Sequence, residues 1–105
     1  METLNYSQVI QDVLDFHANL VPAMHAIYDT DRDRYQLLNI GWNGESQIFG
    51  CPAYVAIEHG KIWIHRDYTE PGIANQLLEA GVPKGDIILA FHAPNVRQYT
   101  DFAVG

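Results

Sequence analysis

The sequence is poor in several features that define whole classes of proteins. Cys51 is the only cysteine among 105 residues, so no intrachain disulfide is possible, and its place between Gly50 and Pro52 indicates a structural residue at a bend. No apolar run approaches the ~20 residues that a membrane span needs. No Lys or Arg precedes Arg32, so the N-terminus lacks the positive region of a signal peptide. We therefore expect a cytoplasmic protein that does not enter a membrane.

Positive charge is also scarce. Six Lys and Arg residues stand against thirteen Asp and Glu residues, which gives a net charge of −7 at pH 7. Residues 1–58 carry two Arg and eight acidic residues, so most of the imbalance lies in this part of the chain. Proteins that hold duplex DNA neutralise phosphates with clustered Lys and Arg, and the linear sequence contains no such cluster. We therefore expect no direct contact with nucleic acid, and action through a partner protein whose own surface is basic.

Motifs that mark enzymes and metal sites are missing as well. Ser7 and Ser46 lie outside any nucleophile elbow, and no phosphate-binding loop or dinucleotide fingerprint occurs. Three alternating aspartates resemble the start of a calcium-binding loop, but the sixth position of such a loop needs Gly and is Arg34 here. A turn in which the aspartates pair with Arg32 and Arg34 explains the pattern better. These aspartates are Asp29, Asp31 and Asp33. None of the five histidines has zinc-site spacing. The sequence predicts no enzyme, no metal and no cofactor.

Hydrophobic periodicity predicts an N-terminal helix followed by strands. Apolar residues at spacings of three and four predict a helix over 6–18, which Asn5 and Gln8 begin as a capping box. Asn43 and Gly44 form the strongest hairpin signal in the chain. The break at residues 50–52 contains a proline, which predicts a β-bulge or a sheet edge. The predicted strands span 24–30, 34–42, 47–58, 61–65 and 87–91.

A second helix determines how the last strand joins the sheet. Pro71 suits a first helical turn and Gly81 can supply a positive φ after the last turn, so a short helix is expected over 71–81. The strand at 87–91 then arrives by a helical crossover and is expected to lie parallel to a neighbour. The prediction is a single α+β domain over 1–105, with a mainly antiparallel sheet of about four to five strands and both helices packed on one face.

Several short motifs, taken in order, resemble the XisI family. They are Asp33 Arg34 Tyr35, Gly41 Trp42 Asn43 Gly44, Gly50 Cys51, the stretches 61–67, 72–81 and 87–92, and Phe102 Ala103 Val104. The resemblance covers nearly the whole chain. Members of this family are named as controlling factors for excision of the fdxN element by a site-specific recombinase. The resemblance implies control of DNA rearrangement beside a second small protein, XisH, and a recombinase complex, and it implies no chemical activity.

Two segments are the candidates for partner binding. Residues 92–100 look irregular and exposed and carry an Arg and a Tyr, residue types that anchor many interfaces. Residues 65–67 end a strand before a helix, a common place for functional groups, although a local Arg66–Asp67 ion pair in a turn is the structural alternative. The predicted partner-binding residues are Arg66, Asp67, His92, Pro94, Arg97 and Tyr99.

Other interpretations stay open at this point. The chain can instead be a DNA-binding accessory factor, or a small-molecule binder or enzyme with an enclosed pocket of His65, Asp67 and His92. A homodimer through the helix face or a free sheet edge is a further alternative. Trp42 and Trp63 are expected as sheet-face aromatics, because the Arg and Lys that accompany base stacking are missing.

Overall fold

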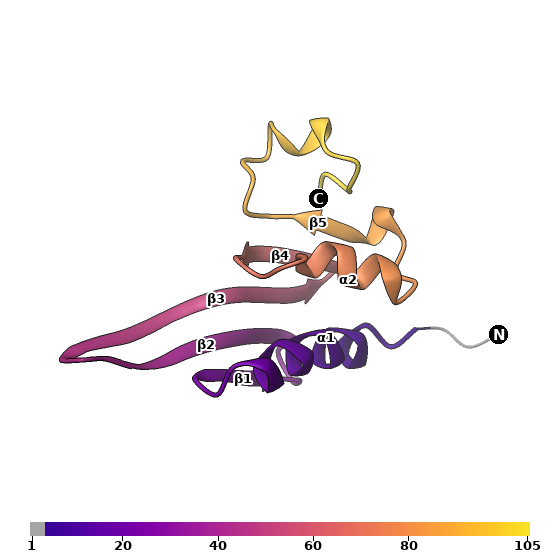
Figure 1. The fold of residues 1–105 in the computed structure, drawn as a ribbon. Helices are drawn as coiled ribbons and strands as arrows, with labels where there is room; N and C mark the ends of the chain where they lie inside the picture. The colour runs from indigo at the N-terminus through magenta and orange to yellow at the C-terminus, as the bar shows by residue number, and fades with distance from the viewer. Residues whose placement is uncertain (1–3) are drawn as a thin grey trace.

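Five strands form one sheet in the order β1-β2-β3-β4-β5, and two helices lie against it (Figure 1). The structure, a computed structural model, describes residues 4–105; the expectation about the N-terminus partly concerns residues 1–3, which lie outside the described residues. Among residues 4–105, neither helix combines the length and the apolar character that a membrane crossing requires. The elements are α1 (Tyr6–Leu20), β1 (Met24–Asp29), β2 (Arg34–Asn43), β3 (Ser46–Glu58), β4 (Lys61–Asp67), α2 (Ile73–Glu79), the 3-10 turn η1 (Lys84–Asp86), β5 (Ile87–Leu89) and the 3-10 turn η2 (Arg97–Tyr99).

The sheet topology confirms the predicted α+β class. Strands β1 to β4 form an antiparallel meander joined by short turns. Strand β5 follows α2 and pairs in parallel with β4, with Ile62 opposite Ile87. The crossover through α2 is what permits the parallel pairing, because a tight turn can only return a strand antiparallel.

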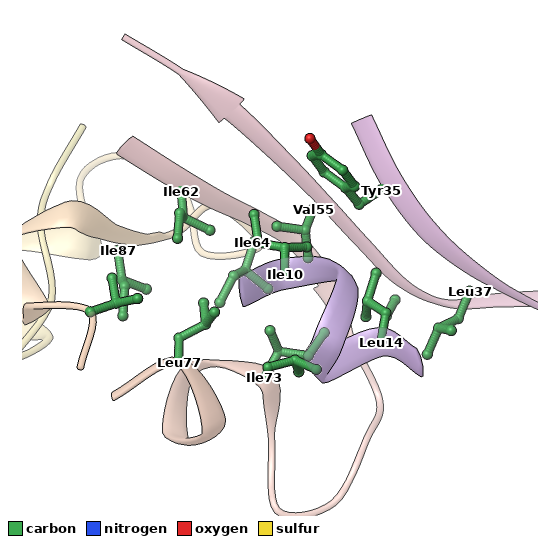
Figure 2. Packing of buried hydrophobic residues seen from close by; sticks show 13 residues of the cluster. Ile10, Leu14, Tyr35, Leu37, Val55, Ile62, Ile64, Ile73, Leu77 and Ile87 are labelled. Carbon is green, nitrogen blue, oxygen red and sulfur yellow. The ribbon is translucent and has the colours of Figure 1, made fainter. Parts of the chain in front are cut away.

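Both helices pack on the same face of the sheet, and the hydrophobic core lies between the helices and the sheet (Figure 2). Helix α1 contributes Ile10 and Leu14, which are fully buried. They meet fully buried side chains of the other elements, which are Tyr35, Leu37, Ala53, Val55, Ile62, Ile64, Ile73, Leu77 and Ile87. On the strands these residues alternate with outward-facing ones, as a half-covered sheet requires.

The ends of α2 differ in how well they were predicted. Gly72 has φ +105°, which no helix accommodates, so Pro71 lies before the helix and the first helical residue is Ile73. The expected start at Pro71 is therefore wrong by two residues. At the other end Gly81 has φ +101° and donates its N–H to Leu78, while Val82 donates to Leu77. This is the Schellman pattern that the glycine predicted.

Strand boundaries shift slightly from the predictions. Helix α1 starts at Tyr6 as predicted, with the Asn5 side chain accepting the Gln8 N–H at 3.1 Å, but it continues two residues further than 18. Strand β4 extends to Asp67, whereas β5 ends at Leu89 rather than at residue 91. The chain after residue 89 therefore turns out of the sheet.

The predicted irregularity in β3 is a β-bulge. Leu37 pairs with Ala53 and Asn39 pairs with Gly50, so one residue of β2 faces two residues of β3 there. Pairing of β3 with β4 begins only at Ala53. Residues 40–51, which we call the arm, therefore form a two-stranded hairpin that projects beyond the rest of the sheet (Figure 1).

Three tyrosines donate hydrogen bonds to carboxylates: two of these bonds join α1 to later elements, and the third lies between the start of β2 and the turn before it. Tyr6 donates to Asp86 at 2.5 Å, Tyr28 donates to Asp15 at 2.5 Å and Tyr35 donates to Asp33 at 2.9 Å. The Asp86 carboxylate, followed by burial, raises the pKa of Tyr6 to about 12. Burial, followed by Asp15, raises the pKa of Tyr28, and burial also raises that of Tyr35. The neutral phenols are thus stabilised in the folded protein.

Candidate functional site

A surface hollow of about 440 Å³ lies beside the end of β4 and the segment that follows β5. Its lining residues are His65, Arg66, Asp67, Tyr68 and Phe91. Because β4 and β5 are parallel, their carboxyl ends meet at the same edge of the sheet, where open α/β sheets commonly bind ligands. Three residues singled out in the sequence, at positions 65–67, come together here.

A bulge in β4 sets the direction of two of these side chains. Val55 pairs with Ile64 and Tyr54 pairs with Arg66, so His65 is an extra residue on β4. Bulges redirect side chains in this way near many functional sites. As a result His65 and Arg66 are both exposed, and the His65 ring lies edge-on to Tyr54 at 5.8 Å.

Arg66 and Tyr68 line both this hollow and a second, smaller hollow beside it. The Arg66 guanidinium lies over the Tyr68 ring at 5.4 Å from its centroid. Both residues also line a hollow of about 290 Å³ at the base of the arm, together with Phe49. Phe49, Arg66, Tyr68 and Phe91, which we call the aromatic strip, therefore form a continuous border along the two hollows. The exposed fractions of Tyr68 and Phe49 are 75% and 67%.

Asp67 stabilises the turn that follows β4. Its Oδ2 accepts the Ile73 N–H at 2.7 Å, and its Oδ1 accepts the N–H and the hydroxyl of Thr69 at 3.0 and 2.5 Å. Among residues 4–105, no ion pair joins Asp67 to Arg66, so the local pair suggested by the sequence is wrong. Asp67 holds the start of α2 in place and leaves Arg66 available to solvent.

The C-terminal segment is fixed from within by Arg97. The Arg97 guanidinium donates to the carbonyl oxygens of His92 and Ala90 at 3.0 and 3.1 Å, and lies 5.7 Å from the centroid of a Trp63 ring. The His92 ring packs on Phe91, with the ring centroids 4.6 Å apart. The Arg97 side chain therefore stabilises the loop by hydrogen bonds to carbonyl groups of the loop backbone.

The other predicted residues of this segment lie outside the hollow. Pro94 and Tyr99 are exposed, Tyr99 with a fraction of 82%, and neither is a lining residue. His92 does not line the hollow either, so His65, Asp67 and His92 do not enclose a common pocket. Of the six predicted partner-binding residues, the hollow brings together Arg66 and Asp67.

Four of the six Lys and Arg side chains lie on the sheet face that the helices leave uncovered. They are Arg34, Lys61, Arg66 and Arg97. Strand pairing places the first three on the side of Ala56 and Trp63, and Arg97 of η2 lies over the Trp63 ring. Trp63 lies on a face of the sheet as expected, but the Arg97 guanidinium beside it is a cationic neighbour that the sequence did not indicate. Arg34 is paired with Glu58 at 2.8 Å, and Arg97 donates to carbonyl groups of its own loop. Lys61 and Arg66, which are half-exposed and exposed, have no ion pair with any of residues 4–105.

The comparison with known families decides which group this chain belongs to. The family model described as XisI protein matches residues 1–104. The chain belongs to the XisI family. No curated protein matches it.

Two solved structures extend this result to three dimensions. An XisI-like protein from Anabaena variabilis ATCC 29413 is 35% identical, with a TM-score of 0.89 and coverage of 95% of this chain and 96% of that chain. The fdxN element excision controlling factor XisI from the same organism is 37% identical, with a TM-score of 0.82 and the same coverages. The predicted family resemblance and the fold are thus confirmed.

In the acidic turn of this XisI chain, Asp29 is paired and hydrogen-bonded by residues of the same turn. Asp29 pairs with Arg32 at 3.0 Å and accepts backbone N–H groups of Asp31 and Arg32, and the Arg32 bonds hold the pKa of Asp29 below its usual range. Arg34 reaches Glu58 instead of the turn aspartates. Within residues 4–105, no three His, Cys, Asp or Glu side chains come together as a metal site.

Sequence reasoning missed most of the aromatic strip of this XisI protein. Phe91 was expected inside a strand, but it follows the end of β5 and turns outward, with an exposed fraction of 49%. For Phe49 the sequence predicts only a place in the strand over 47–58. The available signal was the absence of any Lys, Arg, Asp or Glu from residues 46–52, a stretch that contains Phe49 and Ile48.

Proposed function

We propose that this protein is a non-catalytic controlling factor for excision of a DNA element, and that it acts by binding a partner protein through the aromatic strip. The XisI relative of known structure is named as the excision controlling factor of the fdxN element. The proposed partner is an XisH-type protein within a recombinase complex, and the proposed place of action is the cytoplasm.

The single observation that carries this proposal is the exposure of the aromatic strip. Phe49 and Tyr68 leave two thirds or more of their surface in water, beside an Arg whose charge is not paired by Asp67. Large apolar side chains gathered in this way mark interaction surfaces. Tyr and Arg are also the residue types that contribute most to binding energy at interfaces.

The geometry of the hollow supports a binding role rather than a catalytic one. A general base such as His65 normally has a carboxylate that orients it. The one carboxylate of the hollow, Asp67, directs both oxygens to Thr69 and Ile73. The hollow therefore offers contact surface without an aligned pair of acid and base.

The exposed sheet face supports a protein partner more than duplex DNA. Of its four cations, Arg34 is neutralised by Glu58 and Arg97 is held by carbonyl groups. A duplex-binding surface needs a series of unpaired cations along the phosphates. We therefore expect the isolated protein to give no gel shift, and a shift whose affinity falls with a log–log salt slope of about 0.9 per phosphate contact would contradict this.

Co-purification with the XisH-type protein encoded in the same genome tests the proposal directly. The wild type is expected to form a complex at micromolar concentration, and Arg66→Ala/Tyr68→Ala is expected to weaken it by about tenfold or more. Ile27→Ala is the matched control, because Ile27 is 43% exposed on β1, the opposite edge strand of the sheet. Failure of the wild type to bind would reject the proposed function, and equal binding by both variants would reject the aromatic strip.

A further inference from the structure

A larger groove runs along the opposite, helical side of the molecule. It has a volume of about 510 Å³ and lies between α1 and α2. Its lining includes Val9, Asp12, Val13, Phe16, Gln76 and Glu79. Nothing in the aromatic strip depends on this groove, because the two surfaces share no lining residue.

The floor of the groove is an apolar line on α1. Val9, Val13 and Phe16 follow one another at spacings of four and three, and Leu20 continues the line by four more. Such residues share one side of a helix. The exposed fractions of Phe16 and Leu20 are 52% and 62%, so the line is open to solvent at its C-terminal end. An apolar line of this spacing beside a second helix is the surface that an amphipathic helix recognises.

The rim of the groove is negative on both sides. Asp12 on α1 and Glu79 on α2 are exposed. Neither helix contains a Lys or Arg, and the only basic residue type present, His17, is 7% exposed and bonded to Gln76 at 2.6 Å. A negative charge therefore lies on each side of the apolar floor, and both charges attract a cationic partner.

We infer that the groove between α1 and α2 docks a basic amphipathic helix of a partner protein. The apolar side of that helix covers Val9 and Phe16, and its Lys or Arg residues lie against Asp12 and Glu79. A second copy of this chain does not supply such a helix, since α1 and α2 carry no Lys or Arg. Nucleic acid does not fit either, because its phosphates are repelled by the rim.

A labelled model peptide provides the probe. The peptide has about 14 residues, about four helical turns, with Leu on one side and Lys on the other, and a second peptide carries Glu in place of Lys. Fluorescence anisotropy with the full-length protein is expected to show binding of the Lys peptide only. Absence of binding by the Lys peptide, or equal binding by both peptides, overturns the inference.

Two charge variants separate the groove from general attraction to an acidic protein. Asp12→Lys/Glu79→Lys is expected to weaken binding of the Lys peptide by about tenfold, because it reverses both sides of the rim. Asp31→Lys/Glu45→Lys adds the same charge at exposed sites of two turns and is expected to weaken binding by less than about threefold. Equal weakening by both variants overturns the inference. Circular dichroism of each variant establishes that it is folded.

An apolar pair of variants tests the floor independently of charge. Phe16→Ala is expected to weaken binding of the Lys peptide by about tenfold. Ile27→Ala, at a residue that is 43% exposed on β1 and outside the groove lining, is expected to leave this binding unchanged. If Phe16→Ala instead converts a dimer to a monomer in sedimentation, a second copy is the occupant and the inference is wrong.

Discussion

The body of the sheet and the arm are made of the same two strands but are stabilised in different ways. In the body, β2 and β3 lie between neighbouring strands and beneath helices, and Leu37, Ala53 and Val55 are fully buried. In the arm the same strands pair only with each other, and Trp42 and Phe49 are 68% and 67% exposed. Two-stranded hairpins alone are marginally stable in water. The arm therefore depends on the body for its order, while its side chains remain available for contacts with other molecules.

The largest expected effect lies in the body. Ile64→Ala removes a fully buried side chain between β3 and β5 and should lower the free energy of unfolding by about 2–5 kcal/mol. Urea denaturation followed by circular dichroism measures this change. A decrease in the free energy of unfolding of less than about 1 kcal/mol would contradict the proposed difference in stability between the body and the arm.

A smaller effect is expected where the body meets the hollow. Asp67→Ala removes the acceptor of the Ile73 N–H and of Thr69, so it should lower the free energy of unfolding by about 1–2 kcal/mol. Asp67→Asn keeps one acceptor oxygen and should recover part of the loss. Thermal unfolding of the three proteins compares them, and an unchanged Asp67→Ala variant would show that α2 does not need this contact.

Alkaline pH provides a third comparison, since the tyrosine bonds lie in the body. The pKa of Tyr6 is raised to about 12, so its phenol binds a proton more tightly in the folded state. The resulting stability is complete below about pH 10 and is lost as the pH rises toward 12. Tyr6→Phe should cost about 1 kcal/mol at neutral pH, with the difference from wild type shrinking above pH 10. A difference that stays constant up to pH 12 would argue against this explanation.

The smallest effect is expected in the arm. Phe49→Ala should change the free energy of unfolding by less than about 1 kcal/mol, because its main strand neighbour is the partly exposed Ile40. The same urea experiment as for Ile64→Ala applies. A large loss of stability in Phe49→Ala would mean that Phe49 is needed for folding, and it would contradict the difference between a stable body and an arm available for binding.

Local signals in the sequence predicted much of the fold. Asn5 begins α1, Gly81 ends α2 and the proline in β3 accompanies a bulge, because each of these features depends on the backbone of a few adjacent residues. The parallel position of β5 followed from the length of its connection.

The candidate site was less predictable because it depends on pairing between distant segments. Arg66 and Tyr54 share a side of the sheet only because of the bulge at His65. The use of Arg97 by its own loop depends on carbonyl groups at Ala90 and His92, which no local pattern reveals. Composition describes how many cations a chain has, whereas strand register decides how many of them face the same way.

The burial of α1 has a consequence for the order of events during synthesis. Ile10 and Leu14 are made early, yet the core that they join also includes Ile64, Ile73 and Leu77, which are made about fifty to sixty-seven residues later. Until then the helix can cover only the core side of β1 to β3, which includes Tyr35, Leu37 and Val55. The core around the first helix is therefore completed only after β4 and α2 have been made, although this helix is the first element of the chain.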